Sequence, residues 1–183
     1  NNFNGLSVRR RSVQSVIDEL LMLSNDFGVE HIMWLDDDFF YNQHESMLLL
    51  NEIVRKNINI TWDCTNGVIA TSISNEMAAC AAESGCIGLN IGLESGNKDI
   101  LKLVKKPVSV EKFLKAAEVL YQYPQIFTKV FLIIGFPGET YRQLLDTIEV
   151  TQCAKLDWHL IQHLQPLPNT PLFSDMLDEG LVE

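Results

Sequence analysis

Hydrophobic residues recur along this chain in two alternating patterns, one with helical spacing and one in short apolar runs. Apolar residues three or four positions apart predict helices, at residues 12–27, 43–56, 74–84, 97–104, 110–121 and 141–154. The short apolar runs predict strands, at residues 31–35, 58–62, 87–93, 129–134 and 158–164. Strands that alternate with helices are typical of βαβ units, so the pattern predicts an α/β fold with parallel strands.

Polar residues follow each predicted strand at its carboxyl end. They occupy residues 36–38, 63–66, 94–95, 135–139 and 165. In parallel α/β proteins, ligands bind at the carboxyl ends of the strands. Any one of these segments is equally explained as a turn or a cap of the next helix. Together they predict one shared functional site.

Composition and charge narrow the class of protein. The chain has 183 residues, 46% of them hydrophobic, which is enough for one domain with a real core and excludes disorder. With 24 acidic and 14 basic residues the net charge is −10, so general binding of nucleic acid or of anionic membranes is not expected. No apolar run is long enough to span a bilayer, and residues 1–11 show no secretory signal.

The cysteines do not have the spacing of a metal site. Cys64, Cys80, Cys86 and Cys153 match no zinc, redox or iron–sulfur pattern. His159 and His163 share a strand face, but no third residue at metal-ligand spacing accompanies them. We therefore predict no metal ligands in this chain, and reduced, mostly buried thiols in a cytoplasmic protein.

Four segments together carry a family resemblance. They read G-L-E-S-G at residues 92–96 with Lys106 downstream, I-I-G-F-P-G-E-T at 133–140, P-L-P-N-T-P-L at 166–172, and D-D-D-F at 36–39. In their order and spacing they resemble the radical S-adenosylmethionine (radical SAM) enzymes, most closely the branch that often carries an upstream cobalamin-binding domain. The resemblance extends over residues 9–173 and implies a partial TIM-like (β/α)6 barrel.

The family's cluster-binding motif, C-x-x-x-C-x-x-C, does not occur in the chain. In the family it lies after the first strand, just upstream of the helix that begins here near Ser12. We therefore interpret residues 1–183 as a core-domain fragment holding about the second to sixth βα units. It would lack the first strand and the cluster loop, which leaves a strand edge exposed beside Ile32 and Trp34.

The resemblance implies a chemistry. A four-iron four-sulfur (4Fe-4S) cluster, with ligands upstream of this chain, would bind S-adenosylmethionine and cleave it reductively with an electron from a donor such as flavodoxin or ferredoxin. The substrate, small or macromolecular, is unknown, and use of cobalamin is left open. The cofactors would carry out the radical chemistry, so the protein would orient them and exclude water from the site.

The resemblance also suggests cofactor-binding residues. The carboxylate of Glu94 would accept hydrogen bonds from the ribose, with Ser95 a weaker candidate. Asp36 or Asp37 would meet the methionyl amino group, and Lys106 the methionyl carboxylate. A helix cap for Glu94 and a solvated helix face for Lys106 are the simpler readings.

The remaining candidates lie at the ends of the last two strands. Ile133, Gly135 and Phe136 would pass beside the adenine, and Gln165 completes the set. Glu139 is expected to support the first turn of the next helix. In two places the chain departs from related sequences, with Asn66 in place of an arginine and Asn169 in place of a glycine.

Two other functions fit the same residues. One is a non-catalytic barrel domain that binds a nucleotide or a protein partner. The other is an unrelated α/β enzyme in which Asp37 and Glu94 serve metal-assisted hydrolysis.

Overall fold

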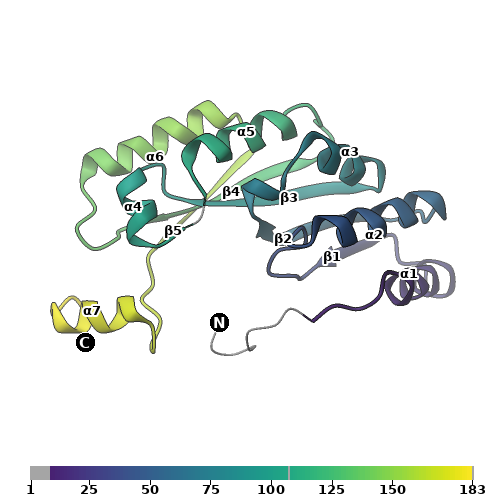
Figure 1. Ribbon diagram of the computed structural model, residues 1–183, viewed down its shortest axis with the longest axis horizontal. Coiled ribbons are helices and arrows are strands. Elements are labelled where there is room, and N and C mark those ends of the chain that lie inside the picture. The colour runs from purple at the N-terminus through teal and green to yellow at the C-terminus, as the bar shows by residue number, and fades with distance from the viewer. Residues whose placement is uncertain (1–8, 107, 183) are drawn as a thin grey trace.

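The computed structural model describes residues 9–106 and 108–182 of the chain (Figure 1). Residues 1–8, most of the segment in which the sequence shows no secretory signal, lie outside these ranges. The five strands form one parallel sheet in chain order, namely β1 (His31–Trp34), β2 (Thr61–Val68), β3 (Cys86–Glu94), β4 (Phe127–Ile134) and β5 (Trp158–His163). The sheet is open, with β1 and β5 at its edges, so the predicted α/β partial barrel with parallel strands is confirmed.

Helices alternate with the strands as the sequence predicts. They are α1 (Val13–Phe27), α2 (Gln43–Arg55), α3 (Asn75–Glu83), α4 (Lys98–Leu103), α5 (Val110–Leu120) and α6 (Tyr141–Ala154). Each begins after a Ser, Asn or Thr whose side chain accepts a hydrogen bond from the first turn. Because these caps are local signals, the predicted helix ends are correct to within one residue.

Apart from a short 3-10 helix, Ala70–Ser72, and a start of β4 two residues before the predicted one, two elements differ from the prediction. The strand predicted at residues 58–62 is β2, Thr61–Val68, because its polar residues alternate with buried ones such as Trp62 and Cys64. Asp63 and the polar residues after it therefore lie within the strand rather than beyond its end. The helix α7, Pro171–Asp178, was not predicted, because the prolines around it suggested a loop; Pro171 stands at its first turn and Thr170 caps it.

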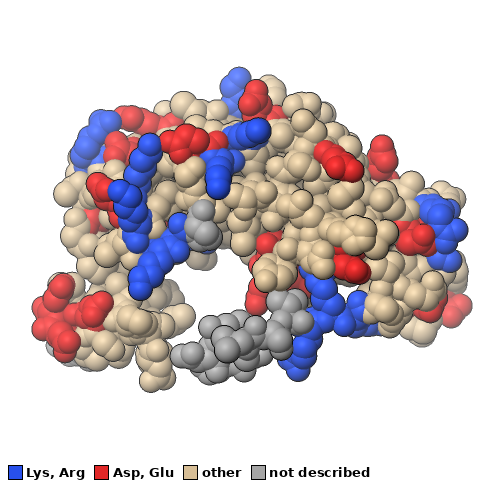
Figure 2. Space-filling model, in the orientation of Figure 1, with Lys and Arg blue, Asp and Glu red and all other residues tan. Residues whose placement is uncertain are grey.

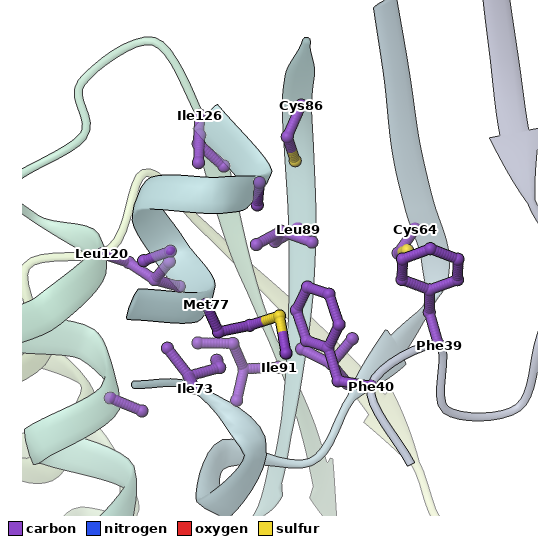
Figure 3. Packing of buried hydrophobic residues seen from close by; sticks show 14 of the residues in the cluster. Phe39, Phe40, Cys64, Ile73, Met77, Cys86, Leu89, Ile91, Leu120 and Ile126 are labelled. Atoms are coloured by element: carbon purple, nitrogen blue, oxygen red, sulfur yellow. The ribbon is translucent and has the colours of Figure 1, made fainter. Parts of the chain in front are cut away.

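The hydrophobic core lies between the outer face of the sheet and the helices. Alternate strand residues such as Trp62, Leu89 and Ile91 are fully buried there. Figure 3 shows Met77 of α3 reaching toward Ile91 and Phe40 within this core. The Trp62 indole donates to the carbonyl of Ser84 at 3.1 Å, so the one polar atom of this large side chain is satisfied.

The inner face of the sheet is not covered in the same way. Helices α3, α5 and α6 lie on one side of the sheet in Figure 1, and Figure 2 shows a hollow on the opposite side. On this inner face Phe127 is 46% exposed, Trp158 57% and Met33 51%. A sheet with one buried and one open face explains why β2 and β4 alternate in burial.

None of the helices in the described part of the chain is long and apolar enough to cross a membrane.

Candidate functional site

Glu94, the last residue of β3, forms an ion pair with Lys106 at the carboxyl end of the sheet. Its Oε1 lies 2.5 Å from Nζ of Lys106, which comes from the connection between α4 and α5. Both side chains are largely buried, at 18% and 29% exposed. A Cβ on Gly92 would lie 3.4 Å from both Glu94 Oε1 and Lys106 Nζ, so the pair stands directly over the inner face of β3.

The loop after Glu94 is held against α6. The amide of Gly96 donates to Oγ1 of Thr147 at 2.9 Å, and the Ser95 and Thr147 hydroxyls lie 3.2 Å apart. Nδ2 of Asn97 donates to the carboxylate of Asp146 at 2.7 Å. A Cβ on Gly96 would lie only 2.6 Å from Thr147 Cα, so only glycine allows this approach. Ser95 is fully buried in this network.

The loop between β4 and α6 is closed by Glu139. Its Oε2 accepts the amides of Gly135 at 2.7 Å and Phe136 at 3.4 Å. The first turn of α6 is instead capped by Thr140, so Glu139 shapes the loop rather than the helix that it was expected to support. Gly135 has φ +83°, and a Cβ there would meet nothing within 4 Å, so the loop borders open space.

The other candidates at this edge differ in accessibility. Ile133 is half-buried and pairs in register with Gln162 of β5, while Gln165 is exposed just beyond that strand. Phe136 is 4% exposed, so its ring is enclosed. Because β3, β4 and β5 are neighbours, Glu94, Gly135 and Gln165 lie at or just beyond three adjacent strand ends.

The end of β1 carries the three aspartates. Asp36 and Asp37 are exposed, and Asp38 is half-buried. Oδ1 of Asp38 accepts the Phe40 amide at 3.2 Å, and its Oδ2 is buried with no hydrogen-bond partner among the described residues. Burial raises the pKa of Asp38. Asp38 is not among the site residues predicted from the sequence, although the apolar Phe39 and Phe40 beside it, both buried, are a signal of its burial.

A cavity of about 470 Å³ lies beside the free edge of β1. It is lined by α1, β1 and α2, with Arg10, Trp34 and Phe39 among its residues. The rings of Trp34 and Phe39 stack at 4.9 Å, and the buried Nε1 of Trp34 has no partner in the described part of the chain. No strand among residues 9–106 and 108–182 pairs with this edge.

Asn66, which stands where related sequences have an arginine, connects β2 to the end of β1. Its Nδ2 donates to the Leu35 carbonyl at 2.9 Å. Asn169 has φ +66°, a conformation that asparagine tolerates better than most residues.

The described residues do not fit an iron–sulfur cluster. No three His, Cys, Asp or Glu side chains within residues 9–106 and 108–182 are placed to hold a metal ion. Cys64, Cys80 and Cys86 are buried, and burial raises the pKa of each thiol, that of Cys86 to about 12. The thiolate is the form that binds iron. Both histidines of β5 are exposed.

The residues do fit a nucleoside with hydroxyl groups. The carboxylate of Glu94 has two oxygens, and Lys106 contacts only one of them. A carboxylate can accept two hydroxyl hydrogen bonds, and the open Gly135 turn leaves room for a ring beside the backbone.

Comparison with known proteins supports the resemblance. The chain is 26% identical to a cytidylyl-2-hydroxyethylphosphonate methyltransferase of Streptomyces wedmorensis, over 100% of the chain and 35% of that protein. It is 26% identical to an uncharacterized methyltransferase of Pyrococcus horikoshii, over 95% of the chain and 37% of the relative. The chain thus spans about a third of the length of these curated relatives.

A solved structure has the same fold. The radical S-adenosylmethionine methyltransferase TsrM of Kitasatospora setae, determined with cobalamin and a [4Fe-4S] cluster bound, superposes with a TM-score of 0.81. The match covers 93% of this chain and 34% of TsrM at 20% identity, which establishes likeness of fold. Over residues 4–151 the chain matches the model of the Radical SAM superfamily, and it therefore belongs to that superfamily.

Proposed function

We propose that residues 1–183 are the core-domain part of a radical SAM enzyme and that this part binds S-adenosylmethionine across the carboxyl ends of β1, β3 and β4. The observation that carries the proposal is the Glu94–Lys106 pair, which stands over the inner face of β3 beside the open Gly135 turn. The cysteines that hold the 4Fe-4S cluster would be supplied from outside this chain. When bound, the cluster supplies the electron for reductive cleavage of S-adenosylmethionine.

Each end of the site has a distinct task in this proposal. Glu94 accepts the ribose hydroxyls, and Lys106 turns from Glu94 toward the methionyl carboxylate. Ser95 keeps the Glu94 loop in place rather than touching the ligand, since its hydroxyl is already bonded to Thr147 and to the Asn97 amide.

The adenine lies along the loop that Glu139 closes. Ile133 and the backbone of Gly135 and Phe136 contact the ring, and Gln165 borders the same space. At the other end of the site, Asp36 or Asp37 meets the methionyl ammonium, an attraction of opposite charges.

We also propose the electron donor, the compartment and the type of reaction. A small electron carrier such as flavodoxin or ferredoxin would deliver the electron. Four thiols free of disulfides favour a reducing compartment, the cytoplasm. The relatives named as methyltransferases favour methyl transfer, and the TsrM structure with bound cobalamin favours a cobalamin-dependent enzyme.

Glu94→Gln tests the proposal in the full-length protein. We expect affinity for S-adenosylmethionine, measured by isothermal titration calorimetry, to fall about tenfold or more, because the charge-assisted hydrogen bonds to the ribose are lost. Glu111→Gln is the matched control, since Glu111 forms an exposed ion pair with Lys98 at 2.9 Å away from the site. Unchanged affinity in Glu94→Gln, together with an unchanged rate of deoxyadenosine formation under dithionite, would remove Glu94 from the site.

A further inference from the structure

The backbone at Glu94 is strained in a way that directs its carboxylate. Glu94 has φ +69°, and among the described non-glycine residues with positive φ it is the one that belongs to a strand. The register of β3 against β4 also shifts between Gly92 and Glu94. Such a bulge redirects a side chain, and a left-handed backbone costs free energy in a residue that has a Cβ. Backbone strain of this kind is concentrated at functional sites.

Lys106 is held by the last turn of α4. Its amide donates to the Leu101 carbonyl at 2.9 Å, and Lys105 before it has φ +54°, as in a Schellman motif. The first turn of α4 is capped by Asn97, three residues after Glu94. The backbones of both members of the ion pair are therefore fixed by the same short unit. The pair opens by rotation of the lysine side chain.

The pair stands apart from other charges. Within the described residues, Nζ of Lys106 forms no salt bridge besides the one to Glu94. The other lysines of α4 differ, since Lys98 and Lys102 pair with carboxylates that are 64% and 80% exposed. The Glu94 and Lys106 side chains are 18% and 29% exposed, so water replaces their contact poorly. Opening the pair is unfavourable unless a ligand provides a new partner for each charge.

The two charges require different groups of a ligand. A carboxylate accepts hydrogen bonds from hydroxyl groups, which a ribose diol supplies. An ammonium has only donors, so in a largely buried place its new partner must be an anionic acceptor. S-adenosylmethionine carries both a diol and a carboxylate. Its cleavage separates them, because 5′-deoxyadenosine keeps the diol and methionine keeps the carboxylate.

We propose that the Glu94–Lys106 pair selects ligands by opening for a molecule that carries both groups. S-adenosylmethionine gives each charge a new partner, so it replaces the pair. 5′-Deoxyadenosine would leave the Lys106 ammonium without one, so the closed pair competes with its ribose for Glu94. The pair therefore lowers affinity for the nucleoside product and favours its release after cleavage. This inference rests on the proposed function, in which Glu94 binds the ribose.

Lys106→Met tests this selection in the full-length, cluster-loaded protein. Binding of S-adenosylmethionine and of 5′-deoxyadenosine is measured by isothermal titration calorimetry without reductant, so that no cleavage occurs. We expect affinity for S-adenosylmethionine to fall about tenfold and affinity for 5′-deoxyadenosine to rise about fivefold, because Glu94 is then free to accept the ribose hydroxyls. Lys106→Arg keeps the charge and should not raise nucleoside affinity. A merely structural role of Lys106 would lower both affinities together, which would overturn the inference.

A second variant decides the matter if Lys106→Met does not fold. Lys106→Gln keeps a hydrogen-bond donor beside Glu94 but removes the charge, so it should shift both affinities in the same directions by smaller factors. Lys102→Met is the matched control, since the Lys102 side chain is 81% exposed and pairs with Asp99. This control should change neither affinity.

The double variant Glu94→Gln/Lys106→Met separates the two proposals. The nucleoside gain requires the freed carboxylate, so it should disappear in the double variant, and a gain that persists would overturn the inference. Unchanged nucleoside affinity in folded Lys106→Met, with S-adenosylmethionine binding still dependent on Glu94, would refute the selection alone. Unchanged S-adenosylmethionine affinity in Glu94→Gln would refute the proposed function, and the inference with it.

Discussion

The two ends of the candidate site, at β3 and at β1, are built very differently. At β3, Glu94 is paired with Lys106, and the loop that follows is bonded to Thr147 and Asp146 of α6. At β1, the aspartates are mostly exposed, and two buried atoms, Nε1 of Trp34 and Oδ2 of Asp38, lack partners within the described residues. Buried polar atoms are nearly always bonded in folded proteins, although Oε1 of Glu139, in the loop after β4, also lacks a partner within the described residues.

The difference shows which half of the site the chain can form by itself. The β3 end draws its partners from elements within the chain, so its geometry follows from the fold. The β1 end borders a free strand edge and a cavity of about 470 Å³, so its geometry depends on what pairs there. We expect a further strand to pair with that edge, as the superfamily resemblance implies.

The largest effect is expected from Gly96→Val at the β3 end. The new Cβ would overlap Thr147 Cα and the Asp146 carbonyl, which lie 2.6 Å and 2.7 Å from its position. The loop and α6 must then separate, and we expect the free energy of unfolding in urea to fall by about 3 kcal/mol or more. Gly92→Ala is the comparison, since its Cβ would meet side-chain atoms only at 3.4 Å. Equal stability of the two variants would show that the close approach at Gly96 is not required.

Thr147→Val should have the next largest effect. The change keeps the shape of the side chain but leaves the buried Gly96 amide without its acceptor, which costs about 1 to 3 kcal/mol. Affinity for S-adenosylmethionine should fall as well, because the Glu94 loop loses its position. Thr151→Val is the control, because that hydroxyl bonds only to carbonyls of its own helix. A loss of stability with unchanged affinity would limit Thr147 to a structural role.

At the β1 end, the free strand edge should make the isolated chain self-associate. Unpaired edges favour pairing with another chain. In sedimentation velocity at increasing concentration we expect dimers or larger species, and Met33→Lys, which places a charge beside the edge, should shift them toward monomer. Leu103→Lys, at an exposed position on α4, should not. A wild-type chain that stays monomeric at all concentrations would contradict the role of the edge.

The smallest effect is expected from Asp38→Asn. Burial raises the pKa of Asp38 from its usual 3.8, so the folded state disfavours the charged form. Stability is therefore lost as the pH rises from that value through the higher folded-state pKa, and the loss persists above it.

Asparagine removes this penalty, so at pH 7 the variant should gain a few tenths of a kcal/mol. The gain should vanish below about pH 4, where both states of the wild type bind the proton. The exposed Asp36→Asn should change nothing, and a gain of Asp38→Asn that persists at pH 3 would exclude charge burial as its cause.

The sequence alone determined the alternation of strands and helices, because helix caps and apolar periodicity are local properties. The capping side chains Ser12, Asn42, Ser74 and Ser109 stand where helices begin, so these ends were predictable. The resemblance also placed Glu94 and Lys106 in one site, and the structure shows them in contact.

Only the tertiary structure decided what surrounds these residues. Asp63 was predicted to follow a strand and Lys129 to begin one, and only the pairing of the strands placed both on one open inner face. Thr147 lies 52 residues after Ser95, and nothing in its local sequence indicates that it holds the Glu94 loop. Burial and long-range hydrogen bonds depend on which elements meet, and that is set by packing of the whole sheet rather than by neighbours along the chain.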